Sequence, residues 1–192
     1  MKTNRVQSVP YSLDELRPIR SAVDQCRSSL QKFIEQYKAM DLLDLETRLL
    51  DRCVYKNWNA RRAESGIQAS RRTVRLLERF LSQRESHLQS ILREFKPDDV
   101  LIRLPSRGTL HQLLASLEQS SMLSSKIKRL AKTTVDRLRV ECSRANYVHY
   151  NILIMSLCSR IFFLISALVQ AQTDLCEKLN ASVKLFKKKL KD

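Results

Sequence analysis

Glycine and proline are scarce in this chain. Its 192 residues include only 2 glycines and 4 prolines. A β-sandwich or an α/β fold needs many turn residues with special backbone angles, and glycine and proline supply most of them. Long helices joined by few connections do not need them. The scarcity therefore predicts an all-α protein, a helical bundle of about five to six helices.

The sequence features of catalysis and cofactor binding are also missing. The three histidines, His87, His111 and His149, lie far apart, and none stands in a metal-ligand pattern with cysteine or carboxylate. Two distant glycines cannot form a Gly-rich loop around a phosphate. We therefore expect no enzymatic activity, no metal, no cofactor and no small-molecule substrate.

Secretion signals are absent as well. The 5 cysteines are odd in number and contain no CxxC pair, which favours free, buried thiols in a reducing compartment. Residues 1–10 are polar and do not resemble a signal peptide. These two observations predict an intracellular protein.

Acidic residues are outnumbered. The chain has 35 Lys plus Arg against 20 Asp plus Glu, a net charge of +15. Such an excess suits a polyanionic partner. Nucleic acid is the first candidate, an anionic membrane surface is the second, and an unusually basic bundle without such a partner is the third.

Apolar residues recur with helical spacing along most of the chain. Ser12 and Glu15 have the spacing of a capping box, and Gly66 marks a break. The expected plan is a flexible tail over residues 1–11, one helical-bundle domain over 12–183 and a lysine-rich tail over 184–192. The pattern predicts helices over residues 12–40, 41–62, 67–95, 109–120 and 122–144, and a last one ending near 189.

The last helix contains a long apolar stretch, residues 152–169. Its length is that of a membrane span, but Arg160 at its centre would raise the insertion cost by about 2.5–3.5 kcal/mol. We expect instead a central helix surrounded by its neighbours. Arg160 is then a buried structural residue that pairs with a carboxylate or backbone carbonyls, or it reaches a polar pocket that contacts a ligand.

Basic residues cluster on the helix expected over 67–95. Arg72, Arg75 and Arg79 are spaced i, i+3, i+7 opposite the apolar seam, and Arg71 widens this ridge. The planar guanidinium group pairs with phosphate through two hydrogen bonds and also stacks on bases. An ordinary solvated face usually mixes charges, whereas only Glu78 interrupts this one. The ridge favours RNA contact over a simple solvated surface.

A second group of candidates lies just upstream. Aromatic rings can stack on unpaired bases, and amides can bond base edges or 2′-hydroxyls. The alternative is that Trp58 anchors the core and the asparagines cap a helix. The candidate RNA-binding residues of this segment are Arg52, Tyr55, Lys56, Asn57, Asn59, Arg61 and Arg62.

Further lysines and arginines over residues 126–144 and in the C-terminal tail would add non-specific, salt-sensitive phosphate affinity. The tail also has the composition of a nuclear or nucleolar address.

Three short elements of the chain, over roughly residues 42–168, match a known family in order and spacing. They are Tyr55-x-Asn57-x-Asn59 with Arg61 and Arg62; Leu104-Pro105-Ser106-Arg107 with Leu110, Leu113 and Leu114; and Leu157-x-Ser159-Arg160-Ile161-Phe162. Together they resemble the Nepro (nucleolus and neural progenitor protein) family, whose helical N-terminal region is similar to the protein subunit found only in RNase MRP.

The resemblance implies a non-catalytic RNA-binding subunit of a ribonucleoprotein, RNase MRP, which processes precursor ribosomal RNA in the nucleolus during ribosome biogenesis. Such a subunit would brace the RNA and dock on other protein subunits, with no membrane partner. The resemblance adds Ser106 and Arg107 to the candidate RNA contacts and marks Arg160. The alternative is a helical protein–protein interaction module without direct RNA contact.

Overall fold

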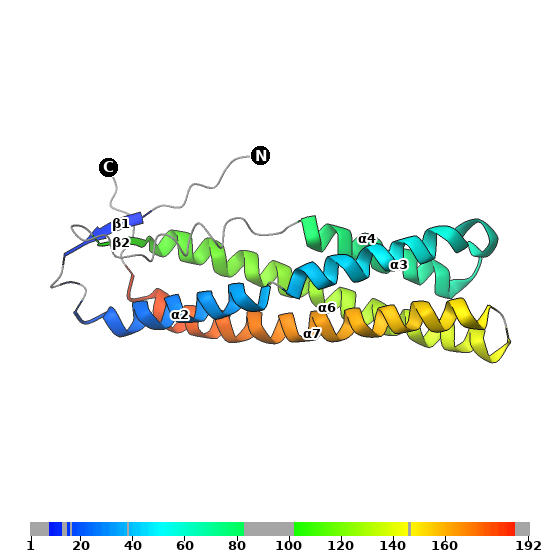
Figure 1. Ribbon diagram of the computed structural model, residues 1–192. Coiled ribbons are helices and arrows are strands. Elements are labelled where there is room, and N and C mark those ends of the chain that lie inside the picture. Colours follow the sequence, from blue (N-terminus) through cyan, green and yellow to red (C-terminus); the bar gives the residue numbers. More distant parts are fainter. Residues whose placement is uncertain are drawn as a thin grey trace. The chain divides into compact units, whose positions relative to one another are not determined.

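The computed structural model describes residues 8–12, 15, 17–37, 39–82, 102–145 and 147–186 (Figure 1). Long helices make up most of this part of the chain, which confirms the all-α prediction and the long apolar C-terminal helix. The elements are β1 (Ser8–Tyr11), α2 (Arg20–Tyr37), α3 (Ala39–Arg61), α4 (Ser65–Ser82), β2 (Ile102–Pro105), α6 (Arg107–Ser143) and α7 (Val148–Val183).

Within the described residues five helices are present, and one expected boundary between helices is missing because α6 is continuous. The helices expected over 109–120 and 122–144 are one helix, since Ser120 and Ser121 between them do not interrupt the backbone hydrogen bonds. The end of the helix expected over 67–95 lies outside the described residues.

The chain forms two compact units, each assembled from separate segments. Helices α6 and α7 each contribute to both units. Unit 1 comprises Met1–Tyr37, Glu85–Gln119 and Ala171–Asp192, and unit 2 comprises Lys38–Arg84 and Ser120–Gln170.

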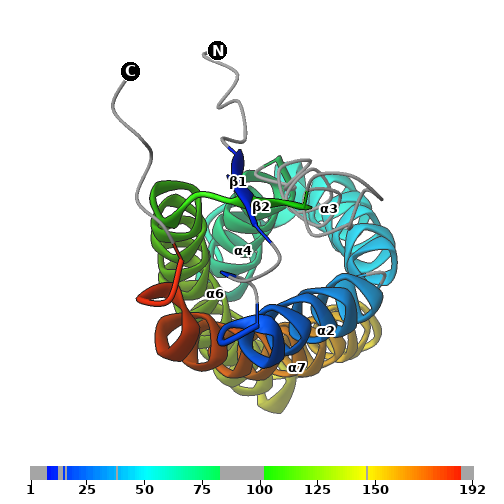
Figure 2. The ribbon, with the colours of Figure 1, turned by 90° about the vertical axis from the view of Figure 1, so that its left-hand side faces the viewer.

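Unit 1 contains a small sheet that the sequence did not predict. Strands β1 and β2 pair antiparallel (Figure 2). Alternate residues of a strand share a face, and here Val9, Tyr11 and Leu104 are buried. Four residues of the expected tail, Ser8–Tyr11, thus form a strand that pairs with a distant part of the chain.

The capping box that precedes α2 is confirmed. The Ser12 N–H donates to a Glu15 carboxylate oxygen at 3.0 Å, and the Glu15 N–H donates to Ser12 Oγ at 3.4 Å. Helix α2 itself begins later than expected, at Arg20, after a turn. It buries Cys26, Leu30 and Phe33, which are spaced i, i+4, i+7.

Unit 2 contains α3, α4, the part of α6 from Ser120 onward and the part of α7 up to Gln170. A turn after Arg61 separates α3 from α4, close to the break predicted at Gly66. A Cβ atom on Gly66 would lie 2.6 Å from Leu138 Cδ2, so glycine lets the start of α4 approach α6 closely. The buried core of this unit includes Leu43, Leu50, Val54, Ile67, Val74, Leu77, Phe80, Ile127, Ala131, Leu138, Ile154, Leu157, Ile161 and Ile165.

Helix α7 is not surrounded by its neighbours, which corrects the expectation of a central helix. By length and composition it could cross a membrane. In its most apolar stretch of 18 residues, 33% is buried. Core helices of soluble proteins can be equally long and apolar, so length and composition alone do not identify a membrane span. Ile152 and Phe163 stay 53% and 71% exposed because the apolar residues of α7 continue around to its outer face.

Candidate nucleic-acid interface

The predicted arginine ridge lies on the outer side of α4. Arg72, Arg75 and Arg79 are exposed, whereas Val74 and Leu77 on the opposite side are buried in unit 2. No carboxylate in the described part of the chain forms an ion pair with any of the three arginines. A guanidinium group stays charged at any physiological pH, so the ridge presents three available cations to solvent.

Arg71 is held more tightly than the rest of the ridge. Its guanidinium carbon lies 3.9 Å from the centroid of the Trp58 ring, and both residues are half-buried. A cation–π contact of this kind contributes about 0.5–1 kcal/mol at an exposed site. The contact joins α3 to α4 and places the only tryptophan at the border between core and surface.

The outer side of α3 carries the other accessible candidates. Tyr55 is 80% exposed. The remaining members of this set, which are also exposed, are Arg52, Lys56 and Asn59 on α3 and Arg62 in the turn directly after it. Trp58 follows Tyr55 by three residues and precedes Arg62 by four, so the Trp58–Arg71 contact lies between the α4 ridge and the α3 candidates. Most of the predicted RNA-binding residues are therefore exposed on the α3–α4 hairpin, whose two helices the Trp58–Arg71 contact joins.

Three predicted RNA contacts are buried and serve the fold instead. Asn57 Nδ2 donates to the Cys53 carbonyl oxygen at 2.8 Å. Ser106 Oγ accepts a hydrogen bond from the Thr109 N–H at 3.2 Å and so caps the start of α6. Arg61 is 1% exposed. Buried side chains do not reach a nucleic acid, so we correct the assignment of direct RNA contact to Asn57, Ser106 and Arg61.

The remaining candidate from the family resemblance lies in the other unit. Arg107 is half-buried at the start of α6, next to Ser106 and within unit 1. The α3–α4 hairpin, in contrast, belongs to unit 2.

Arg61 is the centre of a buried polar cluster that sequence reasoning missed. Its Nη2 donates to Asn151 Oδ1 at 2.7 Å and to Glu141 Oε2 at 3.3 Å, and it also pairs with Glu64. Its guanidinium carbon lies 4.5 Å from the centroid of the Tyr147 ring. We call Arg61, Glu64, Glu141 and Asn151 the Arg61 cluster. It ties the end of α3 to α6 and α7, whose residues are about 80 and 90 positions away.

The pKa values of the two carboxylates in the Arg61 cluster are shifted in opposite directions. Hydrogen bonds from Arg61 hold the pKa of Glu64 below its ordinary value near 4.5. Burial raises the pKa of Glu141 above that value, and the Gly66 N–H, which donates to Glu141 Oε1 at 2.9 Å, only partly opposes this. In the folded state Glu64 therefore binds protons less readily than in the unfolded chain, and Glu141 binds them more readily.

This difference predicts a pH dependence of stability. Below pH 4.5 the free energy of unfolding should rise with pH, because Glu64 binds fewer protons in the folded state. Above pH 4.5 Glu141 should make the free energy of unfolding fall as the pH rises, because Glu141 binds more protons in the folded state than in the unfolded chain. Glu141→Gln should remove that downward contribution, which is at most about 1.4 kcal/mol per pH unit. Urea unfolding at a series of pH values measures it.

The matched control is Glu118→Gln, the same change at an exposed position of the same helix. Its pH profile should follow that of the unchanged protein. If Glu141→Gln leaves the slope above pH 4.5 unaltered, the assignment of that slope to Glu141 is wrong.

Arg160 pairs with a carboxylate, as one of the sequence alternatives predicted. Its Nη2 lies 3.0 Å from Glu46 Oε2. The expected burial is wrong for Arg160, because its side chain is 54% exposed while that of Glu46 is 6% exposed. The arginine therefore neutralises a buried carboxylate on α3 from the outer side of α7.

The described residues offer little for catalysis. Within them no group of three or more His, Cys, Asp or Glu residues could hold a metal ion. None of the five cysteines forms a disulfide, and Cys26 and Cys158 are buried. Burial raises the pKa of the Cys158 thiol to about 12, so this sulfur stays protonated and unreactive.

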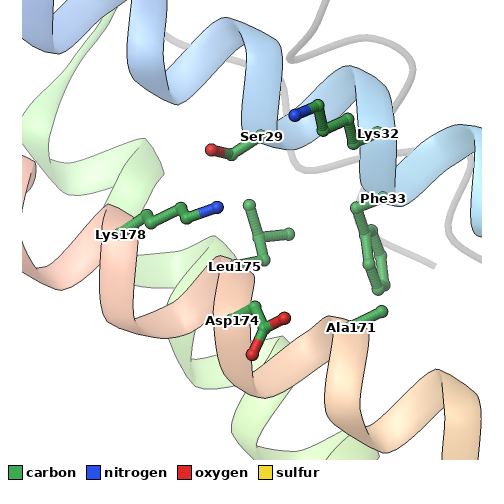
Figure 3. A pocket seen from close by; sticks show the side chains of 7 residues that line it. All are labelled: Ser29, Lys32, Phe33, Ala171, Asp174, Leu175 and Lys178. Atoms are coloured by element: carbon green, nitrogen blue, oxygen red, sulfur yellow. The ribbon is translucent and has the colours of Figure 1, made fainter.

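A small hollow in unit 1 has no counterpart in the sequence predictions. It encloses about 80 Å³ between α2 and the end of α7. Figure 3 shows Lys32 on α2 and Lys178 on α7 with their amino groups directed toward the space between the two helices, where Phe33, Asp174 and Leu175 also lie. Two lysines and one aspartate line the hollow, so it carries charges of both signs.

Long helices, a net charge of +15 and an outer ridge of three arginines that pair with no carboxylate of the described residues define a basic helical-bundle protein with a cation-rich surface. A family model narrows this class. The model described as nucleolus and neural progenitor protein, N-terminal, matches residues 4–180. The chain belongs to this family, as the three short elements indicated. The family and the all-helical fold point to a non-catalytic protein, and the family name points to the nucleolus. Searches of curated proteins and of solved structures gave no match.

Proposed function

We propose that this protein is a non-catalytic RNA-binding subunit of a ribonucleoprotein, RNase MRP, that supports precursor ribosomal RNA processing in the nucleolus. The observation that carries the proposal is the α4 ridge. Arg72, Arg75 and Arg79 are exposed, and no carboxylate of the described residues neutralises them. Positive charge held outward in this way favours a polyanion as the partner.

The dimensions of the ridge suit a phosphate backbone. From Arg72 to Arg79 the helix rises by roughly 10 Å, at about 1.5 Å per residue. A nucleic-acid strand presents several phosphates over such a length. Each guanidinium fork can accept a phosphate through two hydrogen bonds, which fixes orientation as well as charge.

The neighbouring face of α3 would supply contacts of another kind. Tyr55 offers an exposed ring on which an unpaired base can stack, and Asn59 offers an amide for a base edge or a 2′-hydroxyl. In this proposal the hairpin holds and braces an RNA whose catalytic chemistry is its own.

Crosslinking immunoprecipitation from cells, followed by sequencing of the recovered RNA, tests the proposal. Enrichment of the RNase MRP RNA over total RNA is the expected result. Recovery of broad, unselected RNA would contradict the proposal and leave a basic helical protein without a defined RNA.

The alternative function is a helical interaction module without direct RNA contact. The exposed apolar residues of α3 and α7 favour it, because such surfaces bind other proteins. Nuclease treatment separates the two functions. Partners of an interaction module remain bound after the RNA is digested, whereas partners that are held only through RNA are released.

A further inference from the structure

Helix α3 carries an apolar stripe that its own unit does not cover. Leu42, Leu45 and Leu49 are spaced i, i+3, i+7, which places them on one side of the helix. They are 48%, 52% and 37% exposed. The opposite side of α3 already supplies the core through Leu43 and Leu50, so the stripe is not needed for packing inside unit 2.

Helix α7 carries a second such stripe in the same unit. Ile152, Leu153 and Phe163 are 53%, 45% and 71% exposed. Arg160 follows Leu153 by seven residues and precedes Phe163 by three, so these side chains share one side of α7.

An ion pair joins the two stripes. Glu46, which pairs with Arg160 at 3.0 Å, follows Leu42 by four residues and precedes Leu49 by three. The pair therefore sets the leucines of α3 beside the outer side of α7. We call this area the α3–α7 apolar surface; it consists of Leu42, Leu45, Leu49, Ile152, Leu153 and Phe163. Large apolar patches of this kind mark interaction sites in soluble proteins.

The charges around the surface indicate its occupant. Arg52 and Lys56 border the leucine stripe on α3, are exposed and form no ion pair with the described residues. Arg160 remains half exposed at the centre, although it already pairs with Glu46. A second copy of the chain would bring the same basic rim and a net charge of +15, so self-association is disfavoured. An RNA backbone would not cover the apolar side chains.

We propose that the α3–α7 apolar surface binds an acidic amphipathic helix of a partner protein. The apolar side of that helix would cover the two stripes, and its carboxylates would reach Arg52, Lys56 and the exposed edge of Arg160. Helices bind apolar grooves in this way through residues at i, i+3, i+4 and i+7. The inference rests on the proposed function only in that the partner is another protein subunit of the same particle.

A defined peptide tests the proposal with the full-length chain. The probe is a fluorescein-labelled peptide of about 18 residues, five helical turns, with leucines at i, i+3, i+4 and i+7 and glutamates elsewhere. One control peptide has the same composition in scrambled order, and a second has lysine in place of glutamate. Fluorescence anisotropy should show that both controls bind at least about tenfold more weakly than the probe.

Two matched double variants locate the binding. Leu45→Glu with Phe163→Glu should weaken binding of the probe at least about tenfold, because it places like charge on the surface. Met122→Glu with Val140→Glu makes the same change at positions of α6 that are 65% and 54% exposed, and it should leave the affinity unchanged. Leu45→Gln with Phe163→Gln changes the same two positions without adding charge, and so removes apolar contact alone. Circular dichroism confirms that each variant is folded.

Several outcomes would overturn the inference. Equal binding of the scrambled peptide would mean that only net charge is recognised. Loss of probe binding in the α6 control would place the contact elsewhere. If vesicles of phosphatidylcholine and phosphatidylserine bind the protein through this surface and the probe does not, the surface faces a membrane. If sedimentation shows a dimer that the Leu45→Glu, Phe163→Glu variant abolishes, the occupant is a second copy.

The same variants separate this inference from the proposed function. The Leu45→Glu, Phe163→Glu variant should keep its RNA affinity. If RNA affinity fails in the unchanged protein while the acidic probe still binds, the proposed function is wrong and the docking surface stands.

Discussion

Replacement of Arg61 by methionine should lower the free energy of unfolding by about 3–5 kcal/mol, the usual loss when one partner of a buried ion pair is removed. The Arg61 side chain is fully buried, and it is the only cation between Glu64 and Glu141 in the described structure. Without it, two carboxylates face each other, Asn151 Oδ1 loses a donor and Tyr147 loses its cation. Urea unfolding at neutral pH, followed by circular dichroism, measures the loss.

The neighbouring arginine supplies the control. Arg62 is exposed, so Arg62→Met should change stability by no more than about 0.5 kcal/mol. Adding Glu141→Gln to Arg61→Met should restore part of the stability, because it removes one of the two facing charges. Similar losses from Arg61→Met and Arg62→Met, or a double variant no more stable than the single one, would show that the Arg61 cluster does not hold unit 2 together.

The contrast between Arg61 and Arg62 also bears on function. Both belong to the motif that the family resemblance marked, yet one is buried and the other is exposed. A loss of RNA binding in Arg61→Met would follow from unfolding. A loss in Arg62→Met, with stability unchanged, would indicate a direct contact.

Local patterns predicted much of the fold. Helical periodicity depends on neighbours within one or two turns, so the sequence located α3 within two residues of its ends and placed the ridge of α4 outward. The capping box of Ser12 and Glu15 is also local. The ridge could be predicted because Arg72, Arg75 and Arg79 stand opposite an apolar seam on the same helix, without reference to any distant part of the chain.

Features that depend on distant partners could not be predicted. Strand β1 is four residues long and is ordered by β2, more than 90 positions away. Arg61 looks like any basic residue at the end of a helix, and its burial depends on Glu141 and Asn151. The prediction that neighbouring helices surround α7 was wrong. An apolar helix can be covered by its own fold or by another molecule, and its composition does not distinguish the two.

Charge reversal of the α4 ridge, Arg72→Glu with Arg75→Glu and Arg79→Glu, should weaken binding of the RNase MRP RNA at least about 100-fold near 0.1 M salt. Three phosphate contacts would be lost and three repulsions gained. The slope of log affinity against log salt should also become shallower by about two to three, since each phosphate neutralised contributes roughly 0.7–0.9. Filter binding or anisotropy at several salt concentrations measures both quantities.

A matched variant distinguishes a local contact from a general effect of charge. Arg17→Glu with Arg20→Glu and Lys32→Glu changes the net charge by the same amount at exposed positions of unit 1. If it weakens RNA binding as strongly as the ridge variant, the ridge is not the contact surface and the net charge of +15 alone attracts the RNA.

Substitution of the three ridge arginines by lysine separates geometry from charge. Lysine keeps the positive charge but lacks the planar fork that binds phosphate through two hydrogen bonds. It also avoids placing an acidic residue at position 79, in the last turn of α4, where a negative charge opposes the helix dipole. A lysine variant with an unchanged salt slope and a reduced affinity would indicate paired guanidinium–phosphate contacts. Full affinity in the lysine variant would instead mean that the ridge acts through its charge alone.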